Sequence, residues 1–362
     1  MSNLSAFIYS DEYLKYQFGL EHPFNPIREK YTLELLKNLK VFDGKAKIYT
    51  PRPASEEELL LVHSKKYIEF VKTKSAQGTG YLDYGDTPAS KGIYEAACIR
   101  VGGTLLGADL LMRNEVSHAF NPGGGFHHAE AEKAAGFCVF NDIAIVVRYF
   151  QHKYRIKRIA IIDIDGHHGN GTQEIFYKEP ILKISLHRYD EWPTPFYPGT
   201  GKIEEVGEGE GLGFSINVPL PIGTGDEDYL YAFNEIVPHL IESYKPEIII
   251  HQFGVDAHYQ DPLVHLGLTT KVYKEISEIT HNLAHKFSNG KYLILGGGGY
   301  EPRTVARCWA IMFVTISESE VKDLESYNKL FDTPINKERK TKVKEVVEKV
   351  KKIIFPLHNI NI

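Results

Sequence analysis

Short apolar segments alternate with longer segments of helical periodicity through most of the chain. The short segments span residues 117–120, 158–163, 181–186, 247–253 and 291–295; most are rich in β-branched residues and are bounded by polar residues or glycine. Helical spacing of apolar residues predicts helices over residues 56–73, 91–112, 143–152, 227–243, 271–287 and 302–316. Because parallel strands need crossover connections, this alternation predicts an α/β fold with an open, doubly wound, mostly parallel sheet flanked by helices.

The composition is that of a globular protein and argues against several classes of function. The net charge of −5 brings no basic excess, so nucleic-acid binding is not expected. There is no apolar run of about 18 residues to predict a membrane span, and the N-terminal residues lack the features of a signal peptide. Cys98, Cys138 and Cys308 form no C-x-x-C pair, which indicates a reduced, cytoplasmic protein. Nothing in the composition predicts an oligomeric state.

Polar side chains follow four of the predicted strands, at the point where each strand ends. Sites in doubly wound sheets form beyond the carboxyl ends of the strands, so we expect these side chains to meet at one edge. Glycines lie beside them and allow the backbone to approach a ligand closely. The side chains are His127 and His128 after 117–120, Asp163, Asp165 and His167 after 158–163, Asp256 after 247–253, and Tyr300 after 291–295.

Three of these residues have the chemistry of a metal site. Asp165 and His167 are two residues apart, so an extended chain would place both side chains on the same side. Asp256 from another strand would complete a set of three ligands, which leaves the open position for water that catalytic zinc needs. No thiolate is nearby, which favours zinc over a softer metal. An Asp-x-His pair alone is common, so the prediction rests on all four strand ends together.

The same segments resemble the zinc-dependent histone deacetylases over residues 5–317. The motifs that resemble the family are P-G-G-G-F-H-H-A (122–129), G-F-C-V-F-N-D (136–142), D-I-D-G-H-H-G-N-G-T-Q (163–173), S-L-H (185–187), F-Y-P-G-T-G (196–201), G-V-D (254–256) and G-G-G-G-Y (296–300). Residues 22–28 and 256–263 look closest to the bacterial acetoin-utilisation type of deacetylase. The resemblance implies an arginase–deacetylase fold and one deacetylase domain over residues 1–362. Residues 318–362 would be a helical extension, in which Val343, Val346, Val347 and Val350 predict an amphipathic helix over 336–352.

The resemblance also implies a role for each residue of the predicted site. Asp165, His167 and Asp256 would bind one zinc ion, although iron remains open as the native metal. His127 and His128 would lie beside the reacting water, with Asp163 holding the far nitrogen of His127. Asn170, the partner of His128, stands where many members carry Asp, so His128 would be neutral near pH 7. Tyr300 would donate a hydrogen bond to the acetyl carbonyl oxygen.

Further roles follow from the same resemblance. Phe137 and Tyr197, with Gly136 beside them, would flank a narrow tunnel for the acylated side chain. Asp86 would hold the substrate backbone at the rim, and Arg28 would line an internal cavity for acetate. A structural potassium ion would use the side chains of Asp163 and Ser185 and the backbone oxygens of Asp163, Asp165, His167 and Leu186.

The predicted function is removal of acetyl groups from amines, with N6-acetyl-lysine of proteins as the expected substrate and acetate as a product. The alternative is an acetylpolyamine amidohydrolase that acts on small acetylated amines, a branch that Asn170 also fits. In the polyamine-specific eukaryotic branch an acidic residue follows the Asp-Pro pair, whereas Leu263 follows Asp261 and Pro262 here. A non-catalytic protein that binds acyl-lysine would have lost a metal ligand or Tyr300, and this sequence keeps them all. An arginase-like site with two manganese ions would need more Asp ligands than the sequence offers.

Overall fold

Eight strands form one parallel sheet in a computed structural model that describes residues 4–191, 194–333 and 342–361. The strand order across the sheet is β2-β1-β3-β8-β7-β4-β5-β6, and each neighbouring pair runs parallel. The predicted α/β fold with an open, doubly wound sheet is therefore confirmed. The strands are β1 (Ser5–Ile8), β2 (Ala46–Tyr49), β3 (His118–Asn121), β4 (Ile159–Asp163), β5 (Leu182–Arg188), β6 (Ser215–Leu220), β7 (Ile248–Gln252) and β8 (Tyr292–Leu295).

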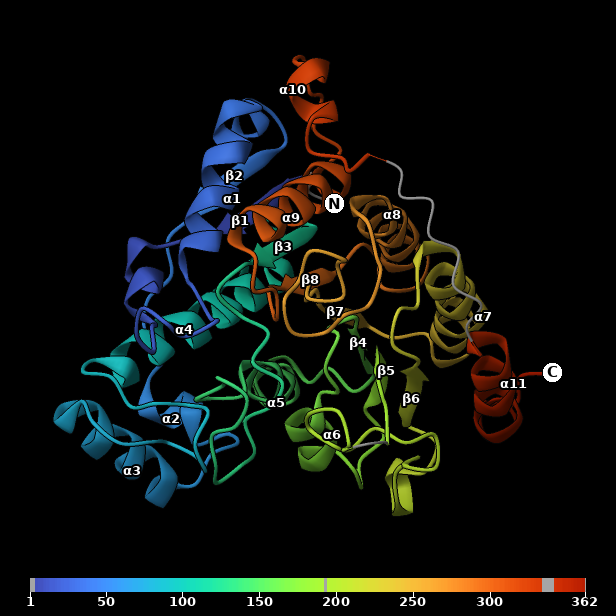
Figure 1. The fold of residues 1–362 in the computed structure, drawn as a ribbon, viewed down its shortest axis with the longest axis horizontal. Coiled ribbons are helices and arrows are strands. Elements are labelled where there is room, and N and C mark those ends of the chain that lie inside the picture. Colours follow the sequence, from blue (N-terminus) through green and yellow to red (C-terminus); the bar gives the residue numbers. More distant parts are fainter. Residues whose placement is uncertain (1–3, 192–193, 334–341, 362) are drawn as a thin grey trace.

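Helices cover both faces of this sheet (Figure 1). One buried core joins the sheet to α1 (Ile27–Asn38), α7 (Asp226–Tyr244), α8 (Thr270–Phe287), α9 (Pro302–Ser317) and α11 (Val343–Ile354). A second core joins the other face to α3 (Lys65–Gln77), α4 (Ile93–Met112) and α5 (Asp142–Tyr154). The shorter helices are α2 (Glu56–Leu59), α6 (Asn170–Ile175) and α10 (Leu324–Asn328), with 3-10 turns η1 (Asp11–Lys15), η2 (Val41–Asp43), η3 (Gly209–Gly211) and η4 (Phe355–His358).

The central strands are apolar on both sides because both faces are covered. In β4, Ala160 and Ile162 point into one core, whereas Ile159 and Ile161 point into the other. This is the reason that the buried strands appear in the sequence as continuous apolar runs rather than as alternating ones. Among the described residues, no helix combines the length and apolar character that crossing a bilayer requires.

The carboxyl ends of five neighbouring strands lie in register. Asp163 pairs with Ser185 on one side and with Gln252 on the other. Gln252 pairs with Leu295, which in turn pairs with Asn121. The loops that leave β3, β8, β7, β4 and β5 therefore start side by side, and these loops carry the polar residues singled out in the sequence.

One predicted helix is wrong. Residues 56–73 do not form a single helix, because α2 ends at Leu59 and α3 begins at Lys65. The Ser64 hydroxyl accepts the N–H of Tyr67 at 3.2 Å and caps α3. His63 is buried in the break, where its Nε2 accepts the N–H of Asn141 at 3.0 Å. The apolar residues keep helical spacing across this turn, but the contact between His63 and Asn141 fixes the turn and interrupts the helix.

Other elements were not anticipated from the sequence. β1 and β2 are only four residues long, and α1 has a weak apolar periodicity. β6 contains Pro219, which a sheet tolerates because β6 is an edge strand. Residues 336–341 of the predicted C-terminal helix lie outside the described residues. Its described part is α11, where Val343, Val347 and Val350 are buried against α7 and β6 and Val346 is partly buried.

Candidate active site

Asp165, His167 and Asp256 come together beyond the carboxyl ends of β4 and β7. One ligand atom from each lies within 4.8 Å of the others, and all three side chains are buried. The Nδ1 atom of His167 lies 2.8 Å from Asp256 Oδ2 and 3.3 Å from Asp165 Oδ1. The sequence expected these three residues to converge, and the structure brings them together.

Backbone and amide donors fix the two carboxylates. Asp165 Oδ2 accepts the side-chain N–H of Gln252 at 2.6 Å and the backbone N–H of Gly298 at 2.7 Å. Asp256 Oδ1 accepts the backbone N–H of Gly166 at 2.6 Å. A Cβ atom at Gly298 would lie 2.3 Å from Asp256 Oδ2, so only glycine allows the backbone to approach both carboxylates.

The charge balance of this cluster calls for a cation. Burial alone would lower the pKa of His167, but its bonds to Asp165 and Asp256 outweigh burial and raise it to about 10. Burial and the neighbouring charge of Asp165 raise the pKa of Asp256 to about 8. Two buried carboxylates this close cannot both be ionised unless a positive charge compensates them. Two carboxylate oxygens and one imidazole nitrogen also form a donor set that suits a divalent metal ion.

Two adjacent histidines face the cluster and have opposite electrostatic surroundings. His127 Nδ1 donates to Asp163 Oδ2 at 2.8 Å, whereas His128 Nδ1 donates to the amide oxygen of Asn170 at 2.7 Å. The carboxylates of Asp163 and Asp165 overcome the effect of burial and raise the pKa of His127 to about 9. Burial, together with the charges of His127 and His167, lowers the pKa of His128 well below its usual value. Their Nε2 atoms are 3.1 Å apart, so a proton can pass between the rings.

Aromatic rings surround the cluster on its open side. The Tyr300 ring lies 6.3 Å from His167 and 5.8 Å from Phe137, centre to centre. The Tyr197 ring lies 5.1 Å from His128. Phe137 adopts a backbone φ of 67°, and its N–H donates to the Thr87 hydroxyl at 3.1 Å. Burial raises the pKa of Tyr300 well above its usual value, so its hydroxyl keeps its proton.

Gly136 is packed tightly between the same groups. A Cβ atom there would lie 2.4 Å from the His128 ring and 2.9 Å from the Tyr197 hydroxyl, and the backbone φ is 53°. Any side chain at this position would push His128 away from the cluster. Gly136 is therefore required by the space around His128 as well as by its backbone conformation.

Asp86 lies beside this aromatic group, partly exposed. Its carboxylate accepts the Thr87 hydroxyl at 2.9 Å, and its backbone oxygen is 3.2 Å from His22 Nε2. Asp83 accepts the backbone N–H groups of Gly85, Asp86 and Thr87 and so folds the loop. Burial, followed by the hydrogen bond and charge of Asp83, raises the pKa of Asp86 to about 6.

Two buried side chains anchor the loop that carries Tyr300. Arg28 on α1 is fully buried and donates through Nη1 to the backbone oxygen of Gly299 at 2.8 Å. Asp261 accepts the backbone N–H of Tyr300 at 2.9 Å and that of Leu263 at 2.8 Å. Leu263 is therefore held close to the Tyr300 loop. In the polyamine-specific branch, the residue at this position, directly after the Asp-Pro pair, is acidic.

The residues expected around a potassium ion also lie together. Asp163 and Ser185 are register partners on β4 and β5, and Leu186 follows Ser185. The Ser185 hydroxyl is 2.9 Å from His187 Nδ1, and His187 Nε2 is 3.0 Å from the Gly201 backbone oxygen. His187 is thus a buried residue whose two ring nitrogens both have partners within the protein.

Two supporting residues were not singled out from the sequence. Gln252 ends β7 and contacts Asp165, and it could have been inferred only from its position four residues before Asp256. Asp142 begins α5, and its carboxylate accepts the backbone N–H groups of Gly125 and Phe126, which lead into His127. Asp142 lies within the recognised G-F-C-V-F-N-D motif, so the motif itself was the available signal.

The match to known proteins agrees with this fold and geometry. The histone deacetylase domain matches residues 22–316, and this chain belongs to that family. Membership indicates an enzyme that hydrolyses acetyl groups and implies a metal cofactor.

Two relatives and one solved structure are similar to this chain over most of its length. The acetoin utilization protein AcuC of Bacillus subtilis (strain 168) is 45% identical over 315 residues, covering 84% of this chain and 80% of its own. AcuC of Staphylococcus aureus (strain MSSA476) is 38% identical over 331 residues, covering 89% and 84%. The crystal structure of the HDA15 HD domain superposes with a TM-score of 0.85 at 28% identity, covering 99% of this chain and 96% of that one.

Replacing Asp256 with Asn should abolish tight metal binding at this cluster. The substitution keeps the shape but removes one of the two negative charges, and we expect a loss of at least roughly 100-fold in affinity. Bound metal would be measured by mass spectrometry after equilibrium dialysis. The exposed Asp43→Asn variant is the control and should match the wild type. Equal metal content in Asp256→Asn and wild type would contradict the assignment.

Proposed function

We propose that this chain is a zinc-dependent deacetylase that hydrolyses N6-acetyl-lysine in proteins and releases acetate. The observation that carries the proposal is the convergence of Asp165, His167 and Asp256 beside a pair of histidines with opposite pKa shifts. The three cysteines are buried and free, which supports a cytoplasmic location.

Asp165, His167 and Asp256 would hold the zinc ion. Their donor set contains no thiolate, and the high pKa of His167 reflects the positive charge that the two carboxylates require. When bound, zinc supplies a Lewis acid that acidifies water and polarises the amide carbonyl.

The histidine pair would handle the protons. The hydrogen bond from His128 Nδ1 to Asn170 makes its Nε2 the acceptor nitrogen, which faces Nε2 of His127, and its low pKa keeps the ring neutral. His128 therefore accepts the proton of the attacking water as a general base. His127 stays charged through its pairing with Asp163 and lies within 3.1 Å of His128. The leaving nitrogen then takes its proton from this pair, giving a free amine.

Tyr300 would stabilise the negative charge that develops on the carbonyl oxygen. Its hydroxyl remains protonated and can donate, while Arg28 and Asp261 hold its loop through the backbone. Phe137 and Tyr197 would flank the acylated side chain as it enters, and Arg28 would line an internal cavity for acetate.

Replacing Tyr300 with Phe should lower kcat by roughly 10²–10³-fold, the usual cost of losing one such donor. Zinc content should not change, because Tyr300 is not a metal ligand in this proposal. Turnover of an acetyl-lysine peptide and metal content would be measured on the same preparation. Tyr259→Phe, a half-exposed tyrosine in the neighbouring loop, is the control and should keep full activity. A fully active Tyr300→Phe variant would rule out this role.

A potassium ion is the second metal that we propose. Asp163 and Ser185 would contribute side chains, and Asp163, Asp165, His167 and Leu186 would contribute backbone oxygens. The pairing of Asp163 with Ser185 across neighbouring strands supports this arrangement. Such an ion would also offset the charge of Asp163, which holds His127.

The choice between protein and polyamine substrates depends on the rim. Leu263 offers no charge to a polyamine ammonium group, which favours acetyl-lysine. We expect kcat/KM for an acetyl-lysine peptide to exceed that for acetylputrescine or acetylspermidine by at least about 100-fold, or ~2.7 kcal/mol. Leu263→Glu should shift this ratio towards the polyamines, and Leu263→Gln is the uncharged control. A wild-type preference for acetylpolyamines would favour the amidohydrolase alternative.

Peptide binding should weaken as the pH falls through about 6, because Asp86 must be ionised to accept N–H groups of a substrate backbone. The carboxylate is charged above this pH and neutral below it, so KM rises on the acidic side. Asp86→Asn should raise KM at pH 8 by roughly tenfold, about 1.4 kcal/mol, and should remove the rise in KM on the acidic side. Acetylputrescine has no peptide backbone, so its KM should respond to neither change. An identical pH profile in Asp86→Asn would contradict the role.

A further inference from the structure

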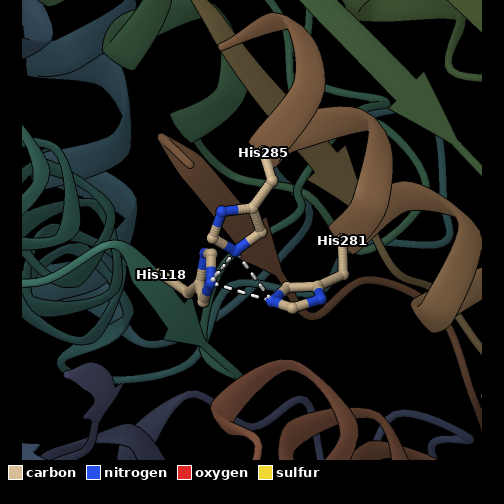
Figure 2. Close-up of side chains that lie close together, drawn as sticks. All are labelled: His118, His281 and His285. Atoms are coloured by element: carbon tan, nitrogen blue, oxygen red, sulfur yellow. Dashed lines mark hydrogen bonds between the residues drawn. The ribbon is translucent and has the colours of Figure 1, made fainter. Parts of the chain in front are cut away.

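Three histidines meet at the opposite end of the sheet from the active site. His118 is the first residue of β3, whereas Asn121 at the other end of that strand leads to the catalytic loops. His281 and His285 are separated by one helical turn on α8 and reach towards His118 (Figure 2). His118 and His281 are buried, and His285 is exposed. No step of the proposed reaction uses these residues.

The Nε2 atoms of all three rings point at one another. His281 Nε2 lies 3.0 Å and His285 Nε2 3.2 Å from His118 Nε2, and the two helical nitrogens are 3.1 Å apart. Each ring nitrogen has one direction in the ring plane and can be either a donor or an acceptor there. Three such atoms facing a common point cannot satisfy all three contacts by hydrogen bonding. At least one pair would bring two lone pairs or two protons together.

A cation removes that conflict because it binds all three lone pairs at once. Zinc–nitrogen bonds of about 2.0–2.1 Å place tetrahedral ligand nitrogens about 3.3–3.4 Å apart. The corresponding spacing for three nitrogens on one face of an octahedron is about 2.9 Å. The distances of 3.0, 3.1 and 3.2 Å lie between these two values. The nitrogens are thus already spaced for a metal ion, with only tenths of an ångström to adjust.

We propose that His118, His281 and His285 form a further metal site, distinct from the zinc and potassium sites, for a divalent transition ion such as zinc, cobalt, nickel or copper. Three imidazoles without a carboxylate or thiolate ligand select this class and disfavour magnesium and calcium, which prefer oxygen. The site is separate from the Asp165–His167–Asp256 cluster and does not depend on the proposed function.

The surroundings suit a bound ion with an open position. A surface cavity of about 330 Å³ includes His281 in its wall, together with Glu278 and Glu318. Lys274 lines the same cavity and pairs with Glu278, and Glu318 pairs with Lys45, so the carboxylates are balanced there. The cavity offers room for water or a small ligand.

A bound ion would join α8 to β3. His118 is fixed in the sheet, where it pairs with Ser5 and Tyr292. His281 and His285 lie near the C-terminal end of α8, whose N-terminal end follows the loop of Asp256 and Asp261. The ion would bind only the folded chain and would therefore stabilise it.

The test is metal stoichiometry on the tag-free full chain. After chelator treatment, cobalt(II) would be titrated by calorimetry, and copper(II) would be added to a second sample for electron paramagnetic resonance. We expect two cobalt sites in the wild type and one in His285→Gln, which changes an exposed residue with little risk to folding. His281→Gln should behave in the same way. His152→Gln, an exposed histidine on α5, is the matched control and should keep both sites.

The outcomes separate this site from the catalytic one. Asp256→Asn should lose the cobalt ion that binds at the Asp165–His167–Asp256 cluster and keep the copper spectrum typical of three nitrogen ligands. His285→Gln should lose that copper spectrum. Deacetylase activity of His285→Gln should stay within twofold of the wild type. The proposal is overturned if His285→Gln and His281→Gln bind as many ions as the wild type, or if the wild type shows no site that these variants remove. Inactivity of the wild type towards acetylated substrates would refute only the proposed function.

Discussion

Two carboxylates buried against one imidazole are the constraint on which the catalytic end of the molecule depends. Asp165 and Asp256 can share this space only if a positive charge lies between them, since burying unpaired charge costs several kcal/mol per ion. Gln252 and the backbone of Gly298 orient Asp165, and the missing Cβ of Gly298 makes room for both acids. The glycine-rich loop therefore both leaves room for the two carboxylates and donates a backbone hydrogen bond to one of them.

The same electrostatics divides two neighbouring histidines into different roles. His127 has a carboxylate partner and holds its proton, whereas His128 has an amide partner and releases it. The pKa of His127 is raised against burial by the carboxylates of Asp163 and Asp165, whereas burial and the charges of His127 and His167 lower the pKa of His128. Environments that push two pKa values apart in this way are typical of acid–base pairs in active sites.

Much of the fold could be predicted from the sequence, because buried parallel strands have continuous runs of apolar residues. β4, β5, β7 and β8 were located within one or two residues, and their trailing loops indicated the metal cluster. The break between α2 and α3 was missed because His63 is held by a loop 78 residues away. Gln252 was missed because it looks like any strand residue until the register with Asp163 is known.

The histidine trio was missed for a related reason. His281 and His285 show a spacing that α8 alone could explain, and His118 lies far from them in the chain. Only the sheet order, which places β3 next to β8, brings them within reach of one another.

The contact between Arg28 and the backbone of Gly299 joins residues 271 positions apart, and it fixes the loop that carries Tyr300. A chain still emerging from the ribosome holds Arg28 long before its partner exists. Contacts of such long range form late, since loop closure must come first. The loop that carries Tyr300 can therefore take its final position only after α1 and the segment that follows β8 have both been synthesised and have met.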